Sequence, residues 1–124
     1  MAMKEFLKLN IKKKTVETGT KAFVIDDHGK VVIFIPSYGV TAYGDTLDEA
    51  KYMLSEIVFE DYFKELLKLN ESQIFEELRK SGWERNEIFH KKYNRTASYV
   101  DPLGVLKDFD LPADTPIKEE YIVA

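Results

Sequence analysis

An uninterrupted apolar run from Val31 to Ile35 is the clearest pattern in the chain, and Pro36 ends it. Short runs of β-branched and aromatic residues bounded by turn residues are typical of strands. Because this run has no polar interruptions, it predicts a strand that is buried on both faces. A second short strand is predicted over residues 40–43, and the helical pattern that follows begins at Thr46.

The helix that begins at Thr46 has an apolar stripe that changes direction. Thr46 and Glu49 have the spacing of a capping box. The apolar residues lie on two faces displaced by about a quarter of a turn. The first face holds Leu47, Ala50, Leu54, Ile57 and Val58, and the second holds Phe59, Tyr62, Leu66 and Leu69. We expect the first half to pack on the sheet and the second half to face the C-terminal segment or a second subunit. A break near Phe59 would also produce the shift.

Further strands are predicted before this unit. An alternating pattern over residues 7–11 is typical of a half-buried strand. Residues 22–25 form another apolar run, and a compact turn at 26–29 joins it to the central run, so that 21–35 should form a hairpin. Together with residues 40–43, this hairpin makes a three-stranded antiparallel meander.

A second, shorter helix is predicted between Asn70 and Gly82. Asn70 and Gln73 have a capping spacing, cations occupy the last turn, and Gly82 is suited to the position just past the helix end. We expect Trp83 to fold back onto Leu78. This helix needs no functional explanation.

The patterns after this helix are weaker. Strands are predicted over residues 87–93 and 97–100. Three prolines interrupt residues 101–124, which predicts an extended arm over the surface. Residues 121–123 are expected to dock as a short strand.

The composition is that of a folded chain of 124 residues, with 44% hydrophobic and 13% aromatic residues,. We expect one domain over residues 1–124, with a core at about 20–92 and an arm at 101–124. The 18 basic residues and 22 acids give a net charge of −4. That charge disfavours non-specific nucleic-acid binding and mildly favours a basic protein partner.

The sequence lacks cysteine, a signal peptide and a membrane span, and these three features bear on cellular location. There is no cysteine, which excludes disulfides and thiolate chemistry. The N-terminal residues contain no apolar stretch of the signal-peptide kind. No apolar run approaches the roughly 20 residues of a membrane span. We therefore expect a soluble, cytoplasmic protein that does not contact the membrane.

The residues around the two turns resemble the signature of the HicB antitoxin family, over about residues 21–60. The shared residues are Pro36, Gly39, Gly44, Asp45, Thr46, Glu49 and Ala50. In that family, a strand ending in Pro leads through a Gly turn to a Gly-Asp-Thr-x-x-Glu-Ala helix start. The turn here is one residue shorter, and Ser37 stands where the family commonly has Asp.

The resemblance implies a partial RNase H-like fold, because the motif describes architecture more firmly than activity. The predicted fold class is α+β, with a small antiparallel sheet in β-β-β-α-β order packed on one long helix. An N-terminal strand and an extended C-terminal arm are additions to this core. The family's fold places the strand at 87–93 beside the first strand of the hairpin.

The resemblance also implies a non-catalytic antitoxin that sequesters a small basic ribonuclease toxin of the HicA type by covering its RNA-binding surface. The family often adds a DNA-binding segment. Here the prolines after Trp83 leave little room for two consecutive helices, which argues against operator DNA binding. The alternatives are an orphan regulatory domain that forms a homo-oligomer and a residual metal-dependent nuclease.

A nuclease would need several carboxylates that converge on divalent cations. The candidates are Asp26, Asp27, Asp45 and Asp61. Turn and cap positions give most of these acids a local role, which favours a structural interpretation. His28 and His90 lack the spacing of metal ligands. We therefore predict no catalytic residue, no cofactor and no metal.

Two basic segments and several aromatic residues are candidates for contacts with partners. Lys12 to Lys14, and His90 with its basic neighbours, could contact phosphate. A lysine-protected edge strand and a solvated strand face are the favoured interpretations of the two segments. The turn aromatics either anchor a partner or cap the sheet. The candidate partner or dimer contacts are Tyr38, Tyr43, Phe59, Tyr62 and Leu66. Self-association is also expected.

Overall fold

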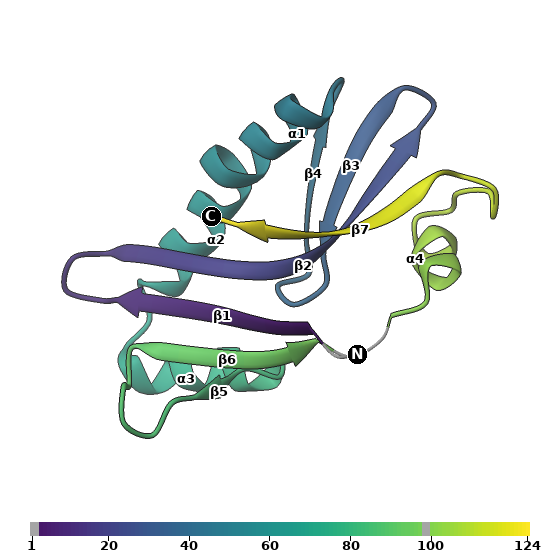
Figure 1. Ribbon diagram of the computed structural model, residues 1–124. Helices are drawn as coiled ribbons and strands as arrows, with labels where there is room; N and C mark the ends of the chain where they lie inside the picture. Colours follow the sequence, from purple (N-terminus) through teal and green to yellow (C-terminus); the bar gives the residue numbers. More distant parts are fainter. Residues whose placement is uncertain (1–2, 98–99) are drawn as a thin grey trace.

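The computed structural model describes residues 3–97 and 100–124. Within these residues the chain has an α+β fold, with a seven-stranded antiparallel sheet, a long helix on one face and two shorter helices (Figure 1). The strands are β1 (Met3–Asn10), β2 (Thr15–Asp27), β3 (Lys30–Ile35), β4 (Val40–Gly44), β5 (Glu84–Arg85), β6 (Lys92–Ala97) and β7 (Ile117–Val123). The long helix comprises α1 (Leu47–Met53), η1 (Leu54–Val58) and α2 (Phe59–Leu66), and the shorter helices are α3 (Glu71–Lys80) and α4 (Pro102–Asp108). The predicted fold class is confirmed.

The predicted meander forms as expected. β2 pairs antiparallel with β3, and β3 pairs antiparallel with β4. Ile33, in the middle of the central apolar run, lies opposite Val24 on one side and Ala42 on the other. All three side chains are buried in the core beneath the long helix. The continuous apolar run therefore corresponds to a strand with neighbours on both sides.

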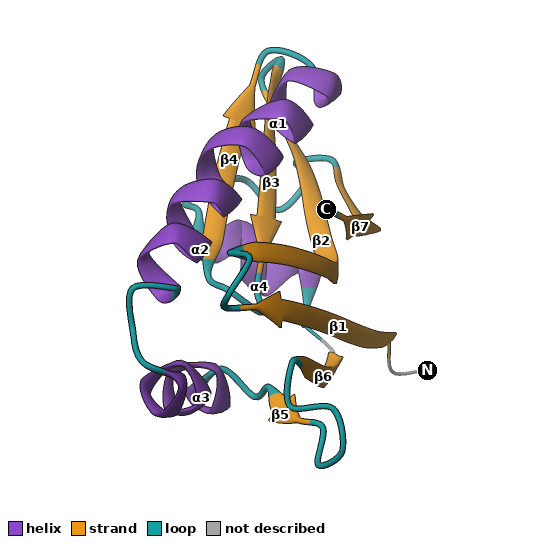
Figure 2. Ribbon diagram, turned by 90° about the vertical axis from the view of Figure 1, so that its left-hand side faces the viewer, coloured by secondary structure: helices purple, strands orange, loops and turns teal. Residues whose placement is uncertain are grey.

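Strand β2 belongs to two halves of the sheet whose strands run in different directions (Figure 2). Its residues 15–19 pair with β1, its residues 23–27 pair with β3, and its residues 19–25 pair with β7. Thr18 exchanges both backbone hydrogen bonds with Ala124, on the β7 side. Because alternate residues of an antiparallel strand bond to opposite edges, β1 and β3 share the other edge of β2. Residues 20–22 lie in the gap between them.

The buried carboxylate of Glu5 fills this gap in the hydrogen bonding of β2. Glu5 is only 1% exposed, and its Oε2 accepts the backbone N–H of Lys21 at 2.9 Å. The same oxygen accepts the hydroxyl of Ser37 at 2.9 Å, and Arg95 donates to Oε1 at 2.7 Å. One carboxylate therefore joins β1, β2, β6 and the turn after β3. Ser37, which departs from the family motif, has a structural role here.

The long helix contains a π-helical turn, η1, between α1 and α2. The N–H of Phe59 bonds to the carbonyl of Leu54, five residues back. The extra residue in this turn realigns the two apolar stripes, so that Leu54, Phe59, Phe63 and Leu66 are buried in one core,. The predicted break near Phe59 is confirmed. The expectation that the second half faces another segment or subunit is wrong.

Helix α3 forms with the predicted caps. Asn70 and Gln73 exchange side-chain and backbone hydrogen bonds, which is a complete capping box,. Gly82 has φ +91°, and the N–H of Trp83 donates to the carbonyl of Leu78 at 3.0 Å. This is the Schellman arrangement, which requires the left-handed conformation that glycine adopts easily. Trp83 folds back into the core as predicted.

The strand predicted over residues 87–93 is wrong in position and partner. Residues 86–91 form a loop, and the strand that follows is β6, which pairs with β1. The place beside the first strand of the hairpin belongs to β7, which runs antiparallel to β2. This result confirms the docking expected for residues 121–123. The strand predicted over 97–100 falls partly on residues 98–99, outside the described residues.

Helix α4 is an element that the sequence analysis missed in the arm. Asp101 caps it by accepting the N–H of Leu103, and Pro102 lies in its first turn. Proline suits this position because the first helical N–H has no partner in any case. Val105 and Leu106 are buried against the face of the sheet opposite the long helix. Pro102 therefore begins a helix where it was expected to prevent one.

Candidate functional site

The motif residues that resemble HicB all lie at the junction between β4 and the long helix or in the turn before β4. A Cβ at Gly44 would collide with the backbone nitrogen of Ala50, so that glycine permits the close approach of helix and strand. Thr46 accepts the N–H of Glu49 at 3.1 Å as the helix cap. Asp45 pairs with Lys30 on the neighbouring strand. These residues therefore act in folding.

The candidate carboxylates do not converge. Asp26 accepts the N–H of Gly29 inside its own turn, and Asp45 is held by Lys30. Asp61 lies exposed on α2. Within residues 3–97 and 100–124, no three His, Cys, Asp or Glu side chains are placed to hold a metal ion.

The predicted partner contacts have two different locations. Phe59 and Leu66 are buried in the core of the chain itself. Tyr38 is also buried, and its ring stacks on Trp83 with centroids 5.3 Å apart. Tyr62 is half-buried against Tyr38, and burial raises its pKa. These four side chains serve the core, and this corrects their assignment as surface contacts.

Tyr43 is the one predicted contact that lies on the surface. Its side chain is 58% exposed on β4, at one edge of the main strand order. Edge strands are accessible to partners from the side as well as from the face. Tyr43 is therefore available to a partner.

The outer face of the long helix is acidic and carries an exposed tyrosine. From residue 45 to residue 61 the acids are Asp45, Asp48, Glu49, Glu56, Glu60 and Asp61, and the one base is Lys51. Lys51 is engaged by Glu120 of β7 at 3.6 Å. Tyr52 lies in the middle of this segment and is 62% exposed. We call this surface the acidic helix face.

Tyr52 was not among the contacts predicted from the sequence, although a signal was present. Asp48 and Glu56 lie four residues before and after Tyr52. This spacing places all three side chains on one side of a helix, away from the apolar stripe. A large aromatic residue on a charged helix face is a candidate anchor for a partner.

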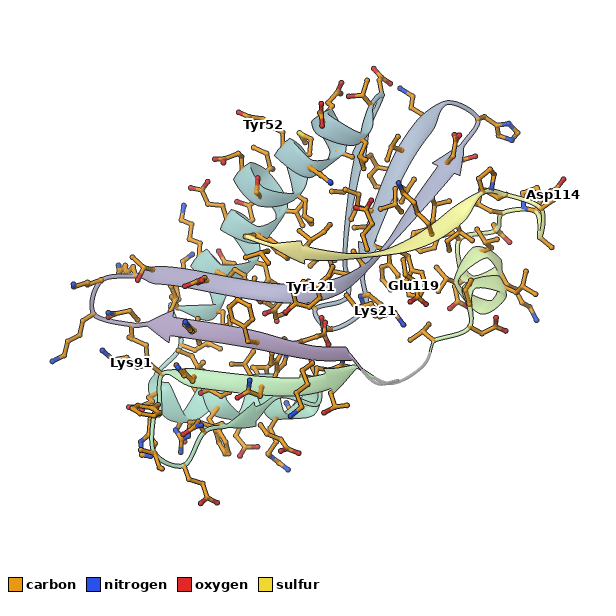
Figure 3. All side chains as sticks on the ribbon, viewed as in Figure 1. Lys21, Tyr52, Lys91, Asp114, Glu119 and Tyr121 are labelled. Carbon is orange, nitrogen blue, oxygen red and sulfur yellow. The ribbon has the colours of Figure 1, made fainter. Side chains whose placement is uncertain are left out.

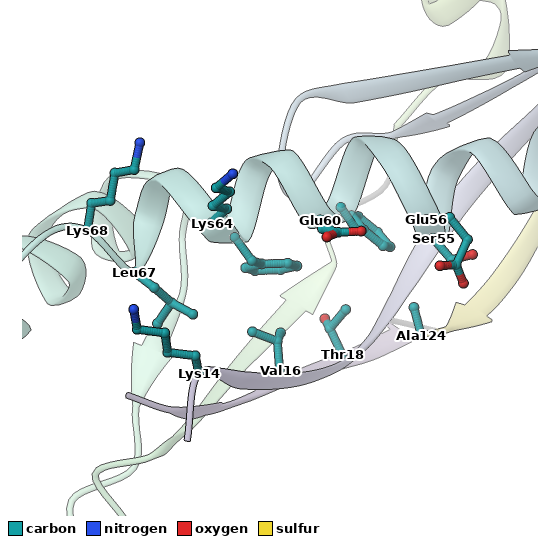
Figure 4. Close-up of a pocket in the computed structure, with 12 residues that line it drawn as sticks. Lys14, Val16, Thr18, Ser55, Glu56, Glu60, Lys64, Leu67, Lys68 and Ala124 are labelled. Atoms are coloured by element: carbon teal, nitrogen blue, oxygen red, sulfur yellow. The ribbon is translucent and has the colours of Figure 1, made fainter. Parts of the chain in front are cut away.

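A groove of about 590 Å³ runs between the long helix and the first half of β2 (Figure 4). Its apolar lining comes from Val16, Phe59, Phe63 and Leu67. Glu56 and Glu60 line it from the helix, so that it borders the acidic helix face. Three lysines, Lys14, Lys64 and Lys68, line its other end. We call this cleft the helix groove.

The edge of β2 beside the helix groove carries β7 and Ala124. Thr18 and Ala124 exchange both backbone hydrogen bonds there, and Ala124 lines the groove. By the alternation of an antiparallel strand, the backbone N–H and C=O of Val16 point to this same edge.

No protein-family model, curated protein or solved structure matches this chain. Among the described residues, no helix is long and apolar enough to cross a membrane.

Proposed function

We propose that the chain is a non-catalytic, HicB-like antitoxin that sequesters a small basic ribonuclease of the HicA type. The observation that supports this most strongly is the acidic helix face with Tyr52 at its centre, next to the helix groove. The resemblance of the strand–helix junction to the HicB signature supports the family. The proposal includes a cytoplasmic location, because the toxin would otherwise cleave RNA there.

The charge of the acidic helix face is complementary to that of a basic partner. Six acids and one lysine between residues 45 and 61 make this segment far more acidic than the chain as a whole, whose net charge is −4. Lys30 offsets the charge of Asp45, and the other five acids are Asp48, Glu49, Glu56, Glu60 and Asp61. A dense patch of one sign steers partners of opposite charge and excludes those of like charge. A protein that binds RNA phosphates has a surface of the opposite charge.

Exposed apolar side chains on the long helix also favour a protein interface. Tyrosine is enriched where interfaces are most tightly bound, because its ring buries a large area at little cost in conformational entropy. Tyr52 and Ile57 are both exposed on the long helix. The helix groove adds an apolar strip further along the same helix, with Glu56 and Glu60 in its lining. Apolar contacts among charged neighbours are the usual organisation of a protein interface.

The mechanism is occlusion. The carboxylates of the acidic helix face would occupy the positions on the toxin that RNA phosphates otherwise take, and the toxin could not bind RNA. No bond is made or broken by this chain.

The experiment measures binding of a purified HicA-type toxin and inhibition of its RNA cleavage. The double variant Glu56→Lys and Glu60→Lys should weaken binding by about tenfold or more, because like charges then face the basic partner. The matched control is Asp108→Lys with Asp114→Lys, which changes the charge equally near α4. Equal inhibition by both variants would contradict the proposal, as would no binding by the unmodified chain.

A homo-oligomer without a toxin partner is the second candidate, and the outer edge of β7 favours it. Even-numbered residues of β7 bond to β2, so that the backbone groups of Glu119, Tyr121 and Val123 point to the other edge, which pairs with no strand within residues 3–97 and 100–124,. Exposed strand edges readily pair with a second chain. Light scattering after size exclusion distinguishes the candidates, since a stable dimer without the toxin favours this one.

A further inference from the structure

Two lysine-rich segments that are far apart in the sequence are neighbours in the fold. The N–H of Leu9 donates to the carbonyl of Lys91 at 2.8 Å, which joins β1 to the loop before β6. Residues 8–14 and 88–92 therefore lie at the same end of the sheet (Figure 3, where Lys91 is labelled). These two segments hold six lysines and His90, and they contain no acid. We call this surface the basic end.

The basic end is concave. A hollow of about 800 Å³ is lined by Lys8, Lys91 and Lys92 together with Ile88 and Phe89. A smaller hollow of about 280 Å³ beside it is lined by Lys12, Lys91 and Tyr93, among other residues. Cationic groups thus line both depressions.

Two apolar side chains at the basic end are exposed to a degree that folding does not explain. Ile88 is 82% exposed and Phe89 is 59% exposed. The ammonium of Lys92 lies 5.3 Å from the centroid of the Phe89 ring. An aromatic face among lysines can stack on a nucleobase while the cations contact the phosphates.

The acids that line the two hollows already have partners. Glu17 lies 4.0 Å from Lys8, and Glu71 lies 3.9 Å from Arg85. The acidic helix face is separate, since Lys64 and Lys68 lie on the long helix and its end, between that face and the turn at residues 11–14 that joins β1 to β2. At physiological salt, exposed charges farther apart than about 8 Å are largely screened. The local positive charge therefore determines binding at this end.

We propose that the basic end binds single-stranded nucleic acid without strong sequence preference, with phosphates on Lys91 and Lys92 and a base against Phe89. This surface is distinct from the one proposed for the toxin. A loop with a hollow accepts an unstacked base, whereas a duplex keeps its bases stacked and unavailable. A membrane would favour a convex apolar tip, and Phe89 instead lines a concavity,.

The test is fluorescence anisotropy of a labelled oligouridylate of about 12 nucleotides at about 50 mM salt. We expect a dissociation constant in the micromolar range, which rises with salt with a logarithmic slope of about 1.4, as contact with two phosphates predicts. Lys91→Glu with Lys92→Glu should weaken binding by about tenfold or more. The matched control, Lys107→Glu with Lys118→Glu, makes the same charge change elsewhere and should have less than about a threefold effect.

The contribution of stacking is tested separately. Phe89→Ala should weaken binding by about fivefold or more and leave the salt slope unchanged, because no phosphate contact is lost. Circular dichroism checks that each variant is folded. No binding by the unmodified chain, or equal losses in the two charge variants, would overturn the proposal. Tighter binding of a duplex of the same length would overturn it, and so would binding to phosphatidylserine vesicles without binding to the oligonucleotide.

Discussion

The two faces of the sheet carry cores of different kinds. On one face, the long helix and α3 cover a large core that contains Tyr38 and Trp83. On the other face, α4 covers a smaller core with Val105 and Leu106 against Phe23. Figure 2 shows the long helix and α4 on opposite sides of β3. The larger core holds side chains from most of the chain, and the smaller one adds the C-terminal arm.

The larger core also includes polar groups at the bend of the sheet. Glu5 joins Lys21, Ser37 and Arg95, and the hydroxyl of Thr18 lies 2.7 Å from that of Tyr38. The smaller core is built from apolar contacts. For example, the rings of Phe34 and Phe109 meet edge to face, with their centroids 5.3 Å apart. Buried polar groups are costly unless every one is paired, and when paired they specify one arrangement. The comparison indicates that the helix-facing core determines how the two halves of the sheet join, whereas α4 adds cover.

The largest expected effect is the loss of Trp83. Trp83→Ala removes the ring that stacks on Tyr38 and leaves a cavity in the helix-facing core. We expect unfolding free energy to fall by about 3–5 kcal/mol, measured by urea denaturation with circular dichroism. Phe89→Ala, which removes an exposed ring, should cost less than about 0.5 kcal/mol. If Trp83→Ala lowered the free energy of unfolding no more than Phe89→Ala does, the importance of the helix-facing core would be contradicted.

The second effect concerns the carboxylate at the bend. Glu5→Ala leaves the N–H of Lys21 and the guanidinium of Arg95 without their acceptor, and should cost about 2–4 kcal/mol,. Glu5→Gln keeps an acceptor and should cost less. The control is Glu17→Ala, which removes an exposed partner of Lys8 and should be nearly neutral,. Urea denaturation measures all three, and equal costs for Glu5→Ala and Glu17→Ala would refute the structural role.

The third effect tests the opposite face. Leu106→Ala should cost about 2–3 kcal/mol, since its side chain is fully buried between α4 and the sheet,. If α4 only covers the sheet, the amides of α4 should exchange faster in this variant, whereas those of β2 and β3 should remain as protected as in the unmodified chain. Equal loss of protection in β2 would show that the two cores unfold as one unit. Leu103→Ala, on the exposed side of α4, is the control.

The smallest effect depends on pH. Burial raises the pKa of Tyr38 above its ordinary value. The folded state therefore favours the neutral hydroxyl. The stability that this hydroxyl contributes is complete below about pH 10, where the unfolded tyrosine ionises, and is lost as the pH rises further. Tyr38→Phe should reduce this alkaline loss and cost about 1 kcal/mol at neutral pH. Tyr43→Phe, on the surface, should change neither quantity in denaturation curves at pH 7 and above 10.

Local signals in the sequence were sufficient for the elements between residues 21 and 82. A capping box at Asn70 and a glycine at Gly82 define α3 without help from the rest of the chain. The shift of the apolar stripe near Phe59 was a real signal, and the π-helical turn is its cause. Helix α4 was missed because its seven residues are too few to show a period and because Pro102 suggested a break.

The candidate surfaces followed from the sequence only in part. The acids of residues 45–61 are close in the chain, so that their shared surface could have been predicted from helical spacing. The burial of Tyr38 could not, because it depends on Trp83, which is 45 positions further along the chain. Lys12 and Lys91 appeared as two unrelated segments, and only the pairing of β1 with β6 brings them together.

The sequence by itself determined the strand-turn-strand-helix unit and its caps, because backbone sterics and capping hydrogen bonds act over four residues or fewer. Tertiary structure decided which strands lie beside β2, which aromatic rings are buried and which lysines share a surface. These choices depend on contacts between distant segments, whose free energy is gained only when the whole sheet has formed. Glu5 shows the difference, since its local sequence indicates no special role, whereas its carboxylate joins four parts of the fold.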